Sequence, residues 1–159
     1  MKRTSRTRKT SGARRGPALR LSVQYAVAAD GQPSHARLRR WALAALHRDA
    51  EVTLRLVGAR EGRALNRRFR GRDYATNVLT FAYDDTAPLT GDIVICLPVV
   101  EREARRQDKG RDAHLAHLVV HGMLHLQGYD HQGGKEALAM ERLETGIVMR
   151  LGYPDPYDG

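Results

Sequence analysis

The sequence predicts a single α+β domain in which a mixed sheet of about four strands is covered by helices. Segments with alternating apolar and polar residues interleave, in the first half, with segments whose apolar residues recur every three or four positions. After residue 97 only the helical period remains, so several helices must pack on one small sheet. The length of 159 residues fits one domain.

The first elements are two strands joined through a helix. Residues 19–28 and residues 51–57 alternate between apolar and polar side chains, which predicts a strand in each segment. Between them, Pro33 and Ser34 can start a helix that runs to about residue 47. A strand, helix, strand connection predicts that the two strands are parallel, with a right-handed crossover.

A short helix and two more strands follow. Leu65 and Phe69, four residues apart, predict a helix over residues 59–70. Residues 77–83 are rich in β-branched and aromatic side chains and predict a third strand. Residues 92–97 are nearly all apolar, which is typical of a strand buried on both faces. The short connection between these two strands favours an antiparallel pair.

The remainder is helical. Pro98 suits the first turn of a helix that continues to about residue 107. Asp112 can cap the next helix, which runs to about residue 127, and Gly128 can end it in the left-handed conformation. A last amphipathic helix is expected over residues 135–151.

Composition narrows the class of protein. Cys96 is the single cysteine, so a disulfide scaffold is excluded and a reducing, cytoplasmic location is expected. No run of eighteen apolar residues occurs, so no membrane span is expected.

The net charge of +9 is concentrated at the start of the chain. Residues 1–20 contain eight basic and no acidic residues, which leaves residues 21–159 close to neutral. We expect residues 1–17 to be a disordered basic tail and residues 18–159 to be the folded domain. The tail is either a solvated extension or an arm for nucleic-acid phosphates. A mitochondrial transit peptide ranks third, because the tail lacks an apolar helical face.

A histidine cluster in the C-terminal half predicts a metal site. His121 and His125 are four apart on the helix expected there, so their imidazoles share one face. Two nitrogens so placed can bind one ion at ~2.0–2.1 Å. Because Gly128 ends the helix, His131 can come round as a third ligand. Three neutral imidazoles with an open fourth position are typical of catalytic zinc.

Neighbouring residues leave alternatives open. His117 and His121 could form the pair instead, although His117 fits better beside the metal, and it and His114 could simply be packed. Asp130 could hold a ligand's second ring nitrogen or merely favour the turn. Gly122 occupies the position where zincin metallopeptidases have their glutamate base, which argues against peptide cleavage.

Several blocks resemble one family. The segment HLVVHGMLHLQGYDH (residues 117–131) resembles the signature of the YbeY family, the bacterial zinc-dependent endoribonucleases of rRNA maturation. LNRRFRGRDYATNVLTF, GDIVIC and ETGIVMRLGYPDPY resemble three further blocks of that family. Phe69, Ala75 and Thr80 depart from the usual Tyr, Pro and Ser, and the basic tail is not part of the pattern.

The resemblance implies both residue roles and a function. It implies His121, His125 and His131 as ligands of one zinc ion and Arg70 as a catalytic arginine, whose guanidinium can bind a phosphate bidentately. It also implies single-strand-specific RNA cleavage in 16S rRNA 3′-end maturation and ribosome quality control. The implied partners are rRNA, small-subunit ribosomal proteins and the GTPase Era. Two alternatives remain: a zincin-like metallopeptidase, and a ribosome-assembly factor whose metal is mainly structural.

Overall fold

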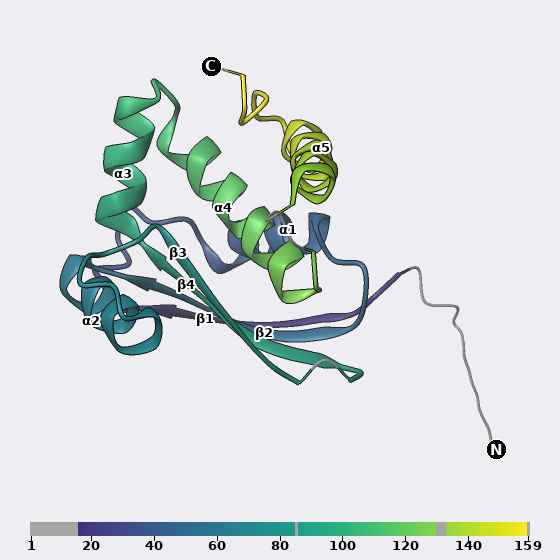
Figure 1. Ribbon diagram of the computed structural model, residues 1–159, viewed down its shortest axis with the longest axis horizontal. Coiled ribbons are helices and arrows are strands. Elements are labelled where there is room, and N and C mark those ends of the chain that lie inside the picture. Colours follow the sequence, from purple (N-terminus) through teal and green to yellow (C-terminus); the bar gives the residue numbers. More distant parts are fainter. Residues whose placement is uncertain (1–15, 85, 130–132, 159) are drawn as a thin grey trace.

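The structure is a computed structural model that describes residues 16–84, 86–129 and 133–158. Within these ranges the chain forms one four-stranded sheet with helices on it, which confirms the predicted α+β class (Figure 1). The expected tail, residues 1–17, lies almost entirely outside the described residues. In the described part, no helix is both long and apolar enough to cross a bilayer.

The elements follow the predicted order. They are β1 (Leu19–Tyr25), α1 (His35–Ala44), β2 (Ala50–Val57), α2 (Ala59–Arg70), β3 (Val78–Asp84), β4 (Leu89–Cys96), α3 (Leu97–Arg106), α4 (Arg111–Leu126) and α5 (Gly134–Arg150). Three predicted bounds were wrong. The first strand ends at Tyr25, three residues earlier than expected. The fourth strand begins at Leu89, because Leu89 already pairs with Ala50 of β2. Helix α1 ends at Ala44, three residues earlier than expected.

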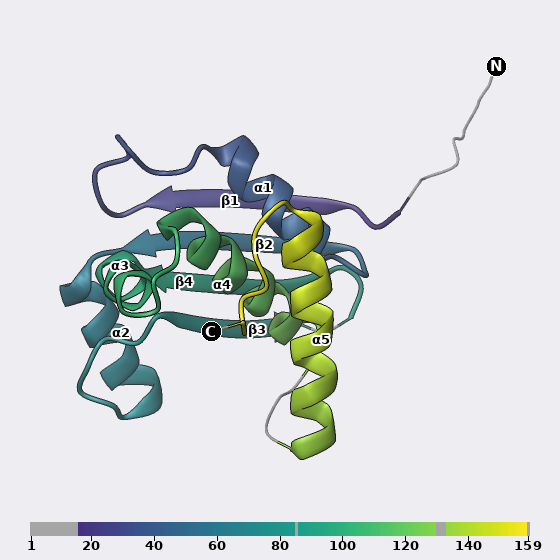
Figure 2. The ribbon, with the colours of Figure 1, turned by 90° about the horizontal axis from the view of Figure 1, so that it is seen from above.

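The strands lie in the order β1-β2-β4-β3 (Figure 2). The pairs β1–β2 and β2–β4 are parallel, and β3 runs antiparallel to β4. Both predicted strand pairings are therefore confirmed. This order makes β3 an edge strand of the sheet.

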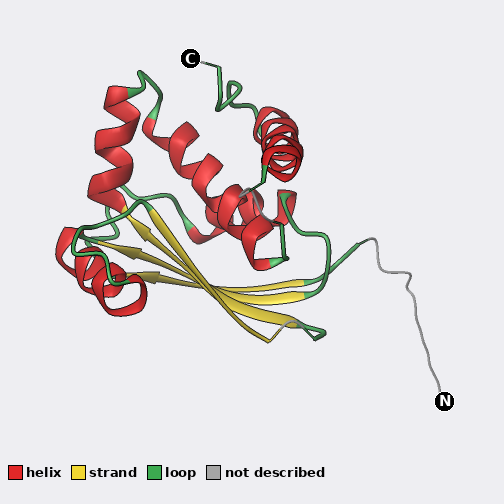
Figure 3. Ribbon diagram, viewed as in Figure 1, coloured by secondary structure: helices red, strands yellow, loops and turns green. Residues whose placement is uncertain are grey.

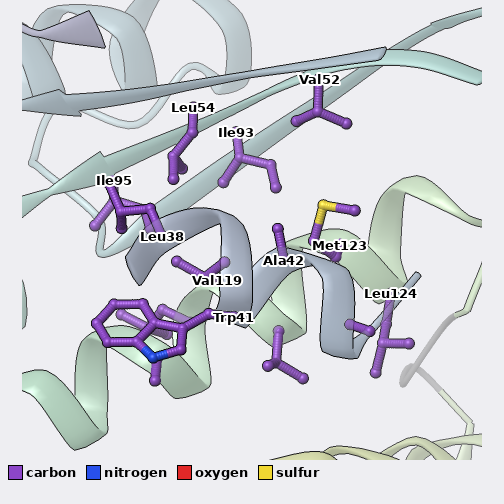
Figure 4. Close-up of a cluster of buried hydrophobic side chains, with 14 of the residues drawn as sticks. Leu38, Trp41, Ala42, Val52, Leu54, Ile93, Ile95, Val119, Met123 and Leu124 are labelled. Atoms are coloured by element: carbon purple, nitrogen blue, oxygen red, sulfur yellow. The ribbon is translucent and has the colours of Figure 1, made fainter. Parts of the chain in front are cut away.

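The main core lies between one face of the sheet and the helices α1 and α4 (Figures 3 and 4). Leu54 of β2 and Ile93 of β4 face Trp41 of α1 and Met123 of α4, and all four side chains are almost fully buried. Burial of each such side chain stabilises the fold by about 1.5–3 kcal/mol. Helix α4 is therefore a rigid platform for the polar side chains on its remaining side.

A smaller cluster covers one end of the opposite face. Val57, Leu79, Val94, Cys96 and Val99 are buried there, with Leu65 of α2 packed against them. Because successive residues of a strand point to opposite faces, β3 contacts α2 with one set of side chains and faces α4 with the other. The edge strand thus lies between α2 and α4.

The ends of α4 are set by glycines. Its N-cap is Gly110, and Asp112, the expected cap, lies in the first turn instead. At the other end Gly128 has a φ of 97°, as predicted. Its N–H donates to the carbonyl of His125 (3.0 Å), and the N–H of Tyr129 donates to that of Leu124 (3.1 Å). This Schellman pattern turns the chain sharply just after His125.

Candidate active site

Four histidines form a stripe along α4. Successive ring centroids from His114 through His117 and His121 to His125 are 6.1, 6.3 and 5.1 Å apart. The closest two rings are those of His121 and His125, the pair that the sequence singled out. Both side chains are half-buried, whereas His114 and His117 are buried.

A buried carboxylate on α5 joins this stripe to the C-terminal segment. Glu144 is only 1% exposed. Its Oε2 accepts a hydrogen bond from Nδ1 of His121 (2.7 Å), and its Oε1 accepts from Nε2 of His117 (2.8 Å). The hydroxyl of Tyr157 donates to the same Oε1 at 2.5 Å. Glu144 therefore receives three donors, two from α4 and one from the C-terminal segment.

The hydrogen bond to Glu144 fixes the orientation of the His121 ring. When Nδ1 of a neutral imidazole carries the proton and donates it to a carboxylate, Nε2 carries the lone pair. A carboxylate that fixes the tautomer and ring orientation of a histidine in this way is the usual support of a metal-binding imidazole. The surroundings of His121 therefore fit a metal ligand.

The charge of Glu144 follows from its partners. Burial by itself raises the pKa of this carboxyl group, but the hydrogen bonds from His117, His121 and Tyr157 outweigh it and lower the pKa to about 2. The pKa of the Tyr157 hydroxyl is raised by burial and by the adjacent carboxylate, so it stays protonated and donates. Glu144 is thus an anion at neutral pH.

His114 has a separate partner. Its Nε2 lies 2.9 Å from Oε1 of Glu103, which also accepts from the amide of Asn77 at 3.0 Å. Burial lowers the pKa of His114 against the opposing effect of Glu103. The structure places His114 in the packing between α3 and α4, whereas His117 shares its carboxylate with His121.

The histidine pair and Arg70 line one cleft of about 600 Å³. Arg70 and Phe69 reach it from the end of α2, and His121 and His125 reach it from α4. Its remaining lining is the edge strand and the residues before it: Thr76, Asn77, Val78, Leu79, Thr80 and Phe81. The arginine and the two histidines, far apart in the sequence, therefore face a common space.

The third expected ligand lies outside the described residues. His131 and Asp130 belong to residues 130–132, so the complete three-histidine site stays a prediction. Within the described ranges, no three histidine, cysteine or acidic side chains converge closely enough to bind a metal. His121 and His125 are the members of the predicted set that the structure brings together.

Gly122 faces away from this cleft. A Cβ atom added to Gly122 would lie 3.1 Å from Cγ2 of Ile93, in the packed layer between α4 and the sheet. A glutamate at this position would have to displace Ile93, which is 1% exposed. The base of a zincin has no room here.

Glu144 was not predicted as a site residue from the sequence. A signal was present, because Met140, Glu144, Ile147 and Val148 recur at helical spacing and all four are buried. A lone acid within the apolar stripe of an amphipathic helix indicates a buried, paired carboxylate. Its partners on α4 could not be identified without the tertiary structure.

The fold and this cleft define the class: a small α+β protein with one cleft lined by an arginine and a histidine pair, one member of which is held by a buried carboxylate. Comparison with known proteins is more specific. The sequence profile of the family described as Endoribonuclease YbeY matches residues 31–152. The chain belongs to this family.

Individual relatives agree with this assignment. An endoribonuclease YbeY from Aromatoleum aromaticum is 60% identical over 142 residues, covering 87% of this chain and 92% of the relative. Those from Nitrosomonas eutropha and Paraburkholderia phymatum are 56% and 52% identical, covering 86% and 91% of this chain and 97% and 99% of the relatives. The solution structure of a Thermotoga maritima protein matches with a TM-score of 0.53 and 24% identity, covering 89% of this chain and 100% of that one, which supports the fold alone.

Proposed function

We propose that this protein is a zinc-dependent endoribonuclease that cleaves single-stranded RNA during maturation of the 16S rRNA 3′ end and ribosome quality control. One observation carries the proposal: a single cleft contains both Arg70 and the His121–His125 pair. The family to which the chain belongs supports the reaction class.

The ion would be bound by His121, His125 and His131. When bound, zinc supplies a Lewis acid and lowers the pKa of a water ligand to ~7. Glu144 keeps His121 in the tautomer that coordinates through Nε2. Glu144 is thus a positioning residue, which acts through His121.

Arg70 is suited to bind the phosphodiester. Its neighbour Asp73 is engaged by Arg63, whose guanidinium donates to both carboxylate oxygens at 2.9 and 3.0 Å. Arg70 itself is exposed and, among the described residues, has no ion-pair partner. An exposed guanidinium that is not held by a carboxylate can bind a phosphate bidentately and stabilise the charge that develops during cleavage.

The two alternatives lack comparable support. A zincin-like peptidase needs a carboxylate base beside the metal, and Gly122 is packed against Ile93 where that base would be. A factor with a mainly structural metal should depend on the ion for its fold. Here α4 is held on the sheet by a large core of apolar side chains that includes none of the histidines.

The proposed setting is the bacterial cytoplasm. Family resemblance supports rRNA, small-subunit ribosomal proteins and the GTPase Era as partners. Arginines around the cleft are consistent with an RNA substrate, because they can neutralise backbone phosphates.

Metal analysis combined with a cleavage assay tests the proposal. Wild type, His121→Ala and His35→Ala would be purified identically, since His35 is an exposed histidine at the start of α1 and serves as a matched control. We expect wild type and His35→Ala to bind zinc and cleave a single-stranded RNA that ends in the 16S precursor sequence. The His121→Ala protein should keep its circular dichroism spectrum but lose both zinc and cleavage. Full cleavage by His121→Ala would refute the proposal.

A further inference from the structure

The mouth of the cleft presents an exposed aromatic ring. Phe69, in the last turn of α2, is 54% exposed. Its ring contacts Phe81 of β3 edge-on, with centroids 5.2 Å apart and planes at 68°. The guanidinium carbon of Arg68 lies 5.2 Å from the centre of the Phe69 ring. Phe69 and Phe81 both line the cleft that contains Arg70 and the histidine pair.

The packing of α2 explains why the Phe69 side chain remains partly exposed to solvent. Leu65 and Phe69 lie one turn apart on the same side of α2, but only Leu65 reaches the buried cluster beneath the helix. Phe69 lies farther along, where Phe81 of the edge strand is its aromatic neighbour. Phe81 therefore supports the ring while much of its surface remains available to a ligand.

The charges around this ring favour an anionic ligand. Residues 60–73 contain six arginines and only two acids. Both acids are already paired: Glu61 with Arg55 at 2.6 Å, and Asp73 with Arg63 at 2.9 Å. Within the part of the chain that the structure describes, Arg68, Arg70 and Arg72 have no carboxylate partner.

We propose that Phe69, supported by Phe81 and flanked by Arg68 and Arg70, is a stacking subsite for one nucleobase of single-stranded RNA. The inference rests on the proposed function for the identity of the ligand. Arginines that neutralise a phosphate backbone, next to an exposed aromatic ring, are the combination by which proteins bind single strands. The cleft extends from this ring past β3 to α4. A strand lying across β3 can thus stack a base on Phe69 while its phosphate contacts Arg70.

The subsite accounts for two aspects of specificity. Every nucleobase has a π-face, so stacking on Phe69 discriminates little between sequences. A base in a duplex is already stacked between its neighbours and cannot reach the ring without being extruded, which costs free energy. The ring therefore selects for single strands rather than for a base.

Equilibrium binding measurements can distinguish base stacking on Phe69 from electrostatic attraction of the phosphates. Anisotropy would be measured with a labelled 2′-O-methyl RNA, whose integrity is checked on a gel, and with an abasic oligonucleotide of equal length. The proteins are wild type, Phe69→Leu, Phe69→Tyr and the control Tyr74→Leu, since Tyr74 is 53% exposed but does not line the cleft. Leucine keeps an apolar contact with Phe81 but removes the π-face.

We expect Phe69→Leu to weaken binding of the base-containing strand roughly 5- to 100-fold, the range of one lost stacking contact. Its binding of the abasic strand should stay within about twofold of wild type, and Phe69→Tyr and Tyr74→Leu should bind both strands like wild type. Unchanged binding by Phe69→Leu would overturn the proposal. An equal loss on both strands would also overturn it, because Phe69 would then act through the fold or the phosphate path.

A fluorescence measurement provides an independent test. Trp41 is the single tryptophan and is fully buried, so a Phe69→Trp variant adds an exposed reporter at the subsite. RNA should quench this emission strongly and that of a Tyr74→Trp variant weakly. Equal quenching would contradict stacking at residue 69.

The two proposals fail separately. Base-dependent binding through Phe69 without RNA cleavage would support the subsite and refute the nuclease. Cleavage by wild type with no effect of Phe69→Leu on binding would refute the subsite alone.

Discussion

Replacement of Glu144 by glutamine tests whether this carboxylate supports His121. The carboxylate accepts from His117, His121 and Tyr157, whereas a glutamine amide has one acceptor oxygen and an NH₂ group that must face a donor. Hydrogen bonds to charged groups contribute ≈ 1.5–3 kcal/mol, and the site is 1% exposed, so water cannot replace them. We expect the free energy of unfolding of the metal-free protein to fall by about 2–3 kcal/mol.

The same change should weaken metal binding. Loss of the carboxylate that orients a metal-binding histidine typically lowers metal affinity roughly 10- to 100-fold. Zinc affinity would be measured by competition with a chromophoric chelator, and stability by urea unfolding. Glu136→Gln, an exposed acid in the first turn of α5, is the matched control. Zinc affinity of Glu144→Gln within about twofold of wild type would refute the orienting role.

Acid titration tests whether Glu144 is an anion in the folded protein. The pKa of Glu144 is lowered from 4.5 to about 2 in the folded protein, so the carboxylate stabilises the fold above pH 4.5. This contribution is lost as the pH falls through about 2. The difference in unfolding free energy between metal-free wild type and Glu144→Gln should therefore narrow as the pH falls from 4.5 to 2. A constant difference over that range would contradict the assignment.

Three further predictions concern the cleft, the packing of α4 and the tail. Arg70→Ala should lower RNA cleavage roughly 100- to 1000-fold and change the free energy of unfolding by less than about 0.5 kcal/mol. The control Arg72→Ala should retain most activity, and equal losses of activity in the two variants would refute a specific role of Arg70. Gly122→Ala should lower the free energy of unfolding, measured in urea, by about 1 kcal/mol, because the close contact of the new methyl group with Ile93 outweighs the gain in helix propensity. A more stable variant would show that the Ile93 side chain can move aside. Deletion of residues 1–17 should weaken RNA binding and flatten its salt dependence if the tail contacts phosphates, and an unchanged slope would make it a solvated extension.

Much of the fold follows from local patterns. Alternation in β1 and β2 and helical spacing in α2 and α4 are properties of nearby residues, because side-chain periodicity depends only on the local backbone. The bounds of α2 agree with the prediction. The start of β4 was missed because Leu89 is held by Ala50 of a different strand, a contact that no local window contains.

The candidate site divides in the same way. A few consecutive residues set the spacing of His121 and His125 and the end of the helix at Gly128. The sequence alone therefore determined that two histidines lie side by side in the last turns of a helix and that a sharp turn follows. Only the tertiary structure showed that Glu144 supports His121 and that Arg70 shares their cleft. These contacts join α2, α4 and α5, and they exist only after the sheet and the core have brought those helices together. The residues that adjoin a position in the sequence therefore do not reveal which distant residues will contact it.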